Sequence, residues 1–189
     1  VVENRPGAGG LIGAEVASKA APDGYTLVVS SLASHVVAPA MSRNPPYDPM
    51  AAFTHIAVVG GPPTLLLVEP DLPARTIAEF VALTKTMRDG MSYGSPGPGS
   101  HGPLIGEVFR AQTGANLVHV SYKGASFALN DLMGKQIRAA FITLSTANQQ
   151  VRSGRLRALG VTSAQRIADL PDVPTFAERG MPQLTALTW

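Results

Sequence analysis

Short apolar segments alternate with amphipathic segments along this chain, and this alternation limits the possible folds more than any other feature. Residues 25–30 are β-prone and apolar almost throughout, which is typical of a strand buried on both faces. Residues 77–86 instead place apolar side chains at helical spacing, behind Thr76 as an N-cap and with Glu79 at the capping-box position. Repeated strand–helix–strand units predict parallel sheets with helices on both faces, which is an α/β fold.

The expected elements follow one another from end to end. We expect strands at 1–3, 25–30, 56–60, 64–68, 91–95, 117–122, 137–142 and 156–162. We expect helices at 11–20, 36–41, 77–86, 102–112, 125–133 and 146–152.

The strands from residue 64 onward are numerous enough to form a second sheet. We therefore predict two lobes with a cleft between them. Residues 1–63 would form the first lobe, residues 64–154 the second lobe, and residues 155–189 a crossover that returns to the first. Clefts at the carboxyl ends of strands are where α/β proteins bind ligands.

Composition excludes several classes of protein. No cysteine occurs among the 189 residues, so a disulfide framework, thiol catalysis and thiolate metal sites are excluded. The net charge is only +2 and the Lys and Arg residues are scattered, which argues against nucleic-acid binding. No apolar stretch is long and clean enough to cross a membrane. The sequence predicts neither a cofactor nor a metal site.

The two ends of the sequence suggest a fragment. The chain begins at Val1 rather than Met, inside an expected strand, and no signal peptide is present. It ends at Trp189 with no helix to close the last unit. We therefore expect the first lobe to be incomplete in this chain.

The segment 93–101 is the strongest candidate for a binding loop. An expected strand ends there, glycines follow, and a helix begins, which exposes backbone N–H groups at the positive end of a helix. Glycines in such a loop let a ligand approach the backbone. An ordinary strand-to-helix turn explains the same pattern about equally well. The candidate contacts are Ser95, Gly97, Gly99, Ser100 and His101.

Three further candidates also lie at or just past strand ends. Ser30, Ser31 and His35 offer hydroxyl groups and an imidazole that can donate to a carboxylate, although a polar loop needs no function. Tyr122 and Lys123 follow the strand at 117, where a lysine is more often simply solvated. Thr143 completes the set as a further group at a strand end.

Catalytic patterns are weak. No Gly-x-Ser-x-Gly elbow occurs, and the four histidines lack metal-ligand spacing. His119 lies between Val118 and Val120 inside a strand, so we interpret it as structural. A Ser/His/Asp triad is not ruled out. However, the groups that recur at strand ends are hydroxyls, glycines and backbone N–H groups, which can bind a ligand, and no nucleophile or base is evident among them.

Several ordered motifs resemble the Bug family, the solute-binding receptors of tripartite tricarboxylate transporters. They read Val-Val-Glu-Asn-Arg-Pro-Gly-Ala-Gly-Gly, Ala-Pro-Asp-Gly-Tyr-Thr-Leu, Pro-Tyr-Asp-Pro, Tyr-Lys-Gly, Leu-Arg-Ala-Leu, Val-Thr-Ser and Leu-Pro-Asp-Val-Pro-Thr, at residues 1–10, 21–27, 46–49, 122–124, 156–159, 161–163 and 170–175. The resemblance spans essentially the whole chain.

The resemblance implies a type II periplasmic-binding-protein fold with two parallel-sheet lobes and an interlobe cleft. It implies a periplasmic receptor that takes a small carboxylate to the membrane subunits of the transporter. This sequence departs from the family pattern at three positions. His101 lies two positions earlier than the family's usual histidine, Ser121 stands where Pro is common, and Arg138 replaces an acid that usually lies in a Gly-Gly-Gln-Val-Asp segment.

Two other functions compete with a transport receptor. A ligand-sensing module of a regulator or two-component sensor has the same fold, and an enzyme on this fold ranks lowest because catalytic residues are not evident. If the receptor reading holds, carboxylate affinity should depend more on the 97–100 loop than on Lys123. Several N–H donors at a helix terminus outweigh one exposed cation, which typically contributes about 0–1 kcal/mol.

Overall fold

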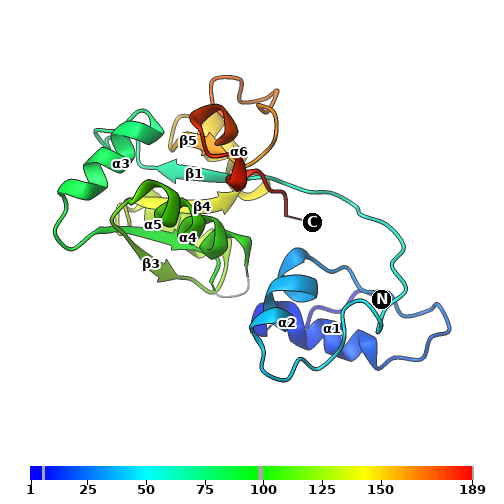
Figure 1. The fold of residues 1–189 in the computed structure, drawn as a ribbon. Coiled ribbons are helices and arrows are strands. Elements are labelled where there is room, and N and C mark those ends of the chain that lie inside the picture. Colours follow the sequence, from blue (N-terminus) through cyan, green and yellow to red (C-terminus); the bar gives the residue numbers. More distant parts are fainter. Residues whose placement is uncertain (6, 98–99, 189) are drawn as a thin grey trace. The chain divides into compact units, whose positions relative to one another are not determined.

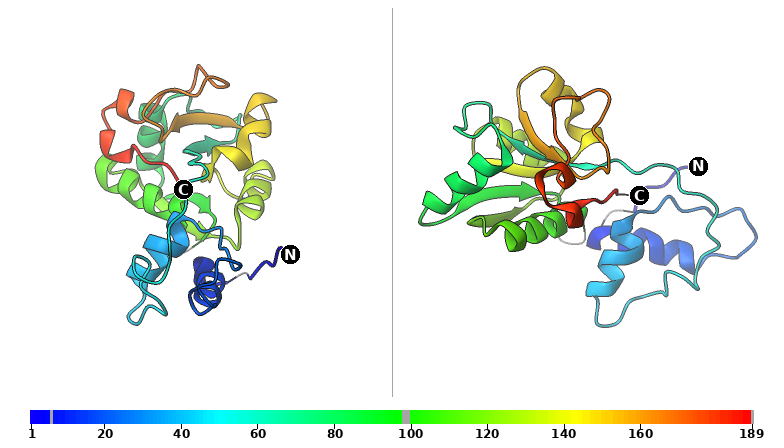
Figure 2. Two further views of the ribbon diagram at one scale, coloured as in Figure 1. Left: turned by 90° about the vertical axis from the view of Figure 1, so that its right-hand side faces the viewer. Right: turned by 45° about the horizontal axis from the view of Figure 1, so that its top comes forward.

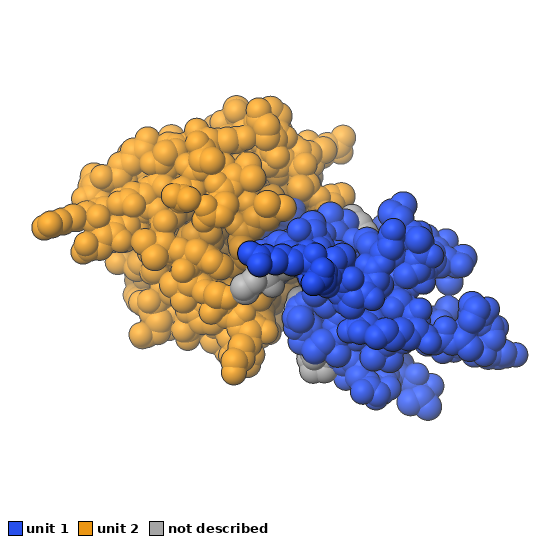
Figure 3. Space-filling model, turned by 60° about the horizontal axis from the view of Figure 1, so that its bottom comes forward, with its two compact units in different colours: residues 1–61, 98–101, 189 blue, residues 62–97, 102–188 orange. Residues whose placement is uncertain are grey.

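The computed structural model describes residues 1–5, 7–97 and 100–188 of the chain (Figure 1). Contacts divide them into two compact units (Figure 3). The first unit contains residues 1–61 with residues 100 and 101, and the second contains residues 62–97 and 102–188. Among the described residues, no helix is long and apolar enough to cross a membrane.

The second unit is built on one five-stranded sheet (Figure 1). In spatial order its strands are β3 (Leu117–Ser121), β2 (Met91–Ser95), β4 (Ala139–Thr143), β1 (Thr64–Val68) and β5 (Arg157–Val161). The strand β2 pairs in parallel with both β3 and β4. The strand β1 pairs antiparallel with both β4 and β5.

Helices cover both faces of this sheet (Figure 2). On one face α3 (Ile77–Thr86) and α4 (His101–Thr113) pack against alternate side chains of the strands, such as Leu66 and Tyr93. On the other face α5 (Ala125–Met133) and α6 (Leu144–Arg152) pack against the intervening side chains, such as Leu65. Because β1 is buried on both faces, its residues from Leu65 to Val68 are apolar without alternation. Two short 3₁₀ turns, η3 (Ala177–Arg179) and η4 (Pro182–Leu184), close the chain.

The first unit is mostly irregular. It contains the 3₁₀ turn η1 (Ala8–Gly10), α1 (Leu11–Ser18), a π-helical turn η2 (Ala33–Val37) and α2 (Ala38–Met41). The ring of Tyr47 is buried and lies 5.4 Å, edge to face, from the ring of Phe53. These rings supply much of the unit's small core.

Three predicted strands are absent from the first unit. Residues 1–3, 25–30 and 56–60 are extended segments without a strand partner in the part of the chain that the structure describes. Their apolar side chains are largely exposed, with Val29 at 96% and Val59 at 93%. A β-prone segment becomes a strand only when a neighbour accepts its hydrogen bonds, so composition alone gave the wrong prediction here.

The second unit also differs from the prediction of wholly parallel sheets. The sheet is mixed because β1 runs against both of its neighbours. Residues 155–188 belong to this unit: β5 hydrogen-bonds to β1, and the Thr162 N–H donates to the Thr64 carbonyl at 3.0 Å. That the chain returns from this segment to the first lobe stays a prediction.

Candidate functional site

One edge of the sheet carries a row of hydroxyl side chains. Since β2, β3 and β4 are parallel, their last residues Ser95, Ser121 and Thr143 lie at the same edge. The strand β1 runs the other way, so its first residue Thr64 pairs with Thr143, and Thr162 follows the end of β5. We call these five residues the hydroxyl edge.

The side chains of the hydroxyl edge differ in their burial and in their hydrogen bonds. Thr162 is buried, accepts from the Thr64 N–H at 2.9 Å and donates to the Ala186 carbonyl at 2.6 Å, so it fastens the chain's last segment to β1. Thr143 is half-buried, and its Oγ1 lies 3.2 Å from the hydroxyl of Thr146 in the first turn of α6. Ser121 is exposed. Ser121 and Thr143 therefore offer the more accessible hydroxyl groups of the row.

Three helices begin at this same edge, because α4 follows β2, α5 follows β3 and α6 follows β4. The first N–H groups of a helix have no partner within it and carry partial positive charge. Anions are favoured where such groups gather, and hydroxyl groups add further donors. The edge is therefore suited to binding a small anion without a cationic side chain.

The loop after β2 was the strongest candidate in the sequence. Ser95 is fully buried, and its Oγ lies 2.7 Å from Nε2 of His119 on the neighbouring strand. Ser100 is half-buried, and His101 is buried at the start of α4, where burial lowers the pKa of its imidazole. Gly99 lies outside the described residues, so its predicted contact stays a prediction.

Gly97 has a packing reason to be glycine. Its φ is +93°, which side chains rarely adopt, and a Cβ there would lie 2.6 Å from the carbonyl oxygen of Tyr122. We expected a glycine in this loop for a different reason, namely access of a ligand to the backbone. A side chain at this position would therefore disturb the loop whether or not a ligand is present.

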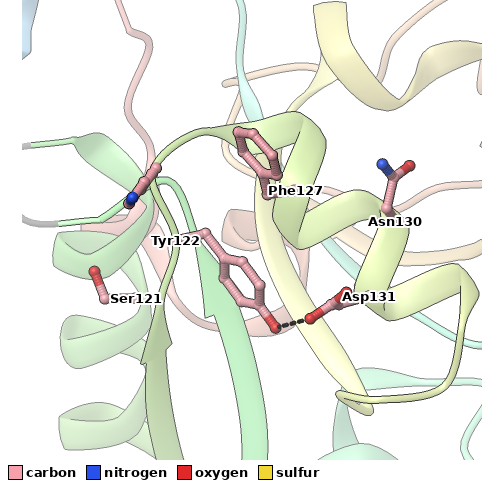
Figure 4. Close-up of a pocket in the computed structure, with 6 residues that line it drawn as sticks. Ser121, Tyr122, Phe127, Asn130 and Asp131 are labelled. Carbon is pink, nitrogen blue, oxygen red and sulfur yellow. Dashed lines mark hydrogen bonds between the residues drawn. The ribbon is translucent and has the colours of Figure 1, made fainter.

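A pocket of about 360 Å³ lies beside α5, at the outer end of the hydroxyl edge (Figure 4). Tyr122 lies at its centre and donates its hydroxyl to Oδ2 of Asp131 at 2.8 Å. Burial and the neighbouring Asp131 carboxylate raise the pKa of Tyr122 to about 12, so the phenol stays protonated. The remaining lining residues are Ser121, Lys123, Phe127 and Asn130. The pocket thus contains two predicted contacts, Tyr122 and Lys123.

The first unit holds the other predicted contacts, and they form one hydrogen-bonded group. Ser30 Oγ bonds to Nδ1 of His35 and lies 2.5 Å from Oγ of Ser34. The His35 N–H donates to the Ser31 carbonyl at 2.9 Å. The Tyr47 hydroxyl donates to the Ser34 carbonyl at 2.6 Å, which ties the turn to the unit's core. The structure therefore brings Ser30, Ser31 and His35 together.

The His35 imidazole is held in a mainly aromatic setting. Its ring centroid lies 4.8 Å from that of Phe53 and 5.9 Å from that of His55. Burial lowers the pKa of His35, and the neighbouring His55 lowers it further. The ring is therefore neutral at neutral pH. That the first-unit residues face those of the second unit across a cleft stays a prediction.

Three contacts at this edge were not indicated by the sequence. His119 was interpreted as structural, and the sequence did not indicate that its Nε2 contacts Ser95. Asp131 holds the Tyr122 hydroxyl, and Thr162 anchors the Thr64 end of the hydroxyl edge. The alternation of Val118, His119 and Val120 placed His119 on a strand, but only the register between β2 and β3 brings it beside Ser95. No group of three or more metal-ligating side chains occurs within the described ranges.

Comparisons with known proteins agree on one family. The family described as "Tripartite tricarboxylate transporter family receptor" matches residues 1–189. BugT of Bordetella pertussis is 36% identical over 191 residues, which cover 100% of this chain and 58% of BugT. The chain spans 55–58% of the length of the first two curated relatives that it matches.

Solved structures give the same result. The periplasmic binding protein BugD is 35% identical with a TM-score of 0.89, over 100% of this chain and 63% of that one. A Rhodopseudomonas palustris protein solved with adipate is 32% identical with a TM-score of 0.92, also over 100% and 63%. MatC from Rhodopseudomonas palustris, solved with bound malate, is 29% identical with a TM-score of 0.85, over 97% and 62%. The fold is thus the α/β fold of these binding proteins.

Proposed function

The chain belongs to the tripartite tricarboxylate transporter receptor family, and we propose that its protein captures a small carboxylate outside the cytoplasm and delivers it to the membrane subunits of such a transporter. Adipate and malate, found in two structural neighbours, name the class of ligand to test first. The membrane subunits and the periplasmic location are part of the proposal.

The start of three helices at this one edge of the sheet, together with its row of hydroxyl groups, carries this proposal. A carboxylate there would accept hydrogen bonds from backbone N–H groups in the first turns of these helices and from hydroxyl groups such as that of Thr143. A net hydrogen bond to a charged group contributes about 1.5–3 kcal/mol, so a few of them suffice for useful affinity. Lys123, which is exposed at the pocket, adds a longer-range attraction.

The geometry also bears on the enzyme alternative. Ser95 and His119 have the spacing of a nucleophile and a general base, with 2.7 Å between Oγ and Nε2. However, Ser95 is fully buried beneath its neighbours, so a substrate has no approach to its hydroxyl in this structure. A binding role for this edge needs no such approach, because the helix N-termini supply the donors.

Thermal-shift screening tests the proposal. The purified protein would be heated with adipate, malate, citrate and acetate, and with adipamide as an uncharged control of the same length as adipate. A ligand at 100 times its dissociation constant stabilises the folded state by about 2.7 kcal/mol, which gives a clear shift. We expect at least one di- or tricarboxylate to shift the transition while adipamide does not. Equal shifts with adipamide, or no shift with any acid, would contradict the proposal.

A further inference from the structure

The hydrogen bond between Ser95 and His119 joins two neighbouring strands at the start of the candidate binding loop. Ser95 ends β2 and His119 lies on β3, the edge strand, directly opposite Tyr93 in the register. The 2.7 Å separation between Oγ and Nε2 is that of a well-formed bond. The side chain of Ser95 is therefore held from β3 in addition to its backbone position in β2.

The imidazole of His119 lies against a buried ring. Its ring centroid lies 5.0 Å from that of Tyr93, which is fully buried. The Tyr93 ring packs edge to face on Phe141 at 5.5 Å, and a Cβ at Gly106 would come within 2.6 Å of Tyr93. The surface beneath the imidazole is thus closely packed. A fixed ring can set the position of its hydrogen-bond partner.

Ser95 in turn lies against the first turn of α4. A Cβ on Gly102 would lie 2.9 Å from Cβ of Ser95 and 2.7 Å from the Phe141 carbonyl oxygen, so helix and strand end touch without a side chain between them. The backbone carbonyl of Ser95 also accepts from the Tyr122 N–H at 3.1 Å. A displacement of Ser95 would therefore be transmitted to the N-terminus of α4 and to the 122–124 turn.

We infer that His119 is a positioning residue for carboxylate binding, acting through Ser95 on the first turn of α4. This inference rests on the proposed function, because the binding donors it positions are those of the hydroxyl edge. His119 touches no ligand in this account. Its contribution is to hold the first turn of α4 in place through Ser95.

The role belongs to the hydrogen bond rather than to a charge. Burial lowers the pKa of His119, although the carboxylate of Glu107 raises it in part. A neutral imidazole can accept from or donate to a serine hydroxyl, and so can the amide of glutamine. The variant His119→Gln therefore keeps a group that can bond to Ser95, whereas His119→Leu keeps bulk and removes the bond.

The test compares His119→Leu, His119→Gln, Ser95→Ala and the double variant His119→Leu/Ser95→Ala. Titration calorimetry with adipate and malate measures affinity. Native-state hydrogen exchange measures the amides of residues 105–107, which in an α-helix bond back to residues 101–103. The amides of β1 serve as an internal control for global stability.

We expect His119→Leu and Ser95→Ala each to weaken carboxylate binding at least tenfold and to speed exchange at residues 105–107 at least tenfold, with β1 changed less. The double variant should be no worse than either single one, because both remove the same bond. His119→Gln should stay within threefold of the parent in both measurements.

Several outcomes would overturn the inference. Parent-like affinity and exchange in His119→Leu would show that the bond positions nothing, while adipate or malate binding by the parent would leave the proposed function standing. Equal damage in His119→Leu and His119→Gln would assign the effect to ring packing on Tyr93. If the parent binds neither acid, the proposed function fails for these ligands, and unchanged exchange at residues 105–107 in His119→Leu would still refute the positioning role.

Discussion

At the 122–124 turn, backbone N–H donors should contribute more to carboxylate affinity than the exposed side chain of Lys123. Two single variants in this turn separate the possibilities. Lys123→Ala removes the cation that lines the pocket. Ala125→Pro removes an N–H at the first position of α5, where proline is well tolerated because that N–H has no partner within the helix.

The backbone is compatible with this proline. Gly124 precedes it with φ 179° and ψ 162°, which is the extended conformation that a residue before proline prefers. A compatible proline commonly stabilises a protein by about 0.4–1 kcal/mol through the unfolded chain. We therefore expect Ala125→Pro to unfold at the same temperature as the parent or slightly higher. Weaker binding by this variant could not then be attributed to misfolding.

The expected losses of affinity in the two variants differ enough to decide between backbone donors and the lysine. Loss of a hydrogen bond to a charged group costs about 1.5–3 kcal/mol, or roughly 10- to 150-fold in affinity. Loss of an exposed cation costs about 0–1 kcal/mol, or at most roughly fivefold. Titration calorimetry with the best carboxylate would compare both variants with Lys85→Ala, which removes an exposed lysine near the end of α3. If Lys123→Ala abolished binding and Ala125→Pro bound normally, a direct salt bridge would replace the backbone mechanism.

Three further predictions concern stability, and chemical denaturation checks each. Gly97→Ala should cost about 2–4 kcal/mol, because φ is +93° and the new Cβ meets the Tyr122 carbonyl oxygen; parent-like stability would contradict this. Gly106→Ala gains about 1 kcal/mol of helix propensity, but its Cβ would lie 2.6 Å from the buried Tyr93 ring. We therefore expect this variant to lose roughly 1–2 kcal/mol of stability, and a net gain in stability would show that the Tyr93 ring can move aside. Burial lowers the pKa of His101, so the unfolded chain binds more protons, and stability should fall as the pH drops below about 6.5; His101→Gln should flatten this fall, and an unchanged slope would contradict it.

Local signals in the sequence predicted much of the second unit. The bounds of α3, α5, β1 and β2 agree with the expected residues because each combines a clear period with a turn or cap. Thr76 accepts from the Glu79 N–H at 3.2 Å, as its N-cap position predicted. Glu79, however, reaches back to the Arg75 N–H at 2.6 Å rather than to that of the cap residue. Capping chemistry was thus predictable to within one residue.

Long-range pairing could not be predicted in the same way. An apolar strand buried on both faces, such as β1, carries no mark of its direction, so its antiparallel pairing was missed. The segments 25–30 and 56–60 have strand composition but no pairing partner among the described residues. The bond from His119 to Ser95 depends on the register of two strands separated by α4. Each of these features is set by a neighbour distant in sequence.

Two arginines of the second unit, Arg138 and Arg157, lie at the edge of the sheet opposite the hydroxyl edge. Arg138, which stands where the family usually has an acid, directly precedes β4 and pairs with the buried carboxylate of Glu69. Arg157 donates to the carbonyls of residues 70, 72 and 74 near that same edge. A five-residue strand separates Arg138 from Thr143 by about 17 Å, which exceeds the screening length of about 8–10 Å in physiological salt.

This separation limits what the Arg138 departure can change. A buried carboxylate is costly unless it is paired, so Arg138 stabilises the β1–β4 end of the sheet rather than reshaping a binding site. The hydroxyl edge keeps neutral donors and helix N-termini, whose strength does not depend on the distant ion pairs. Ligand preference in this chain should therefore follow the hydroxyl groups and backbone N–H groups of that edge, and the identity of residue 138 should affect stability instead.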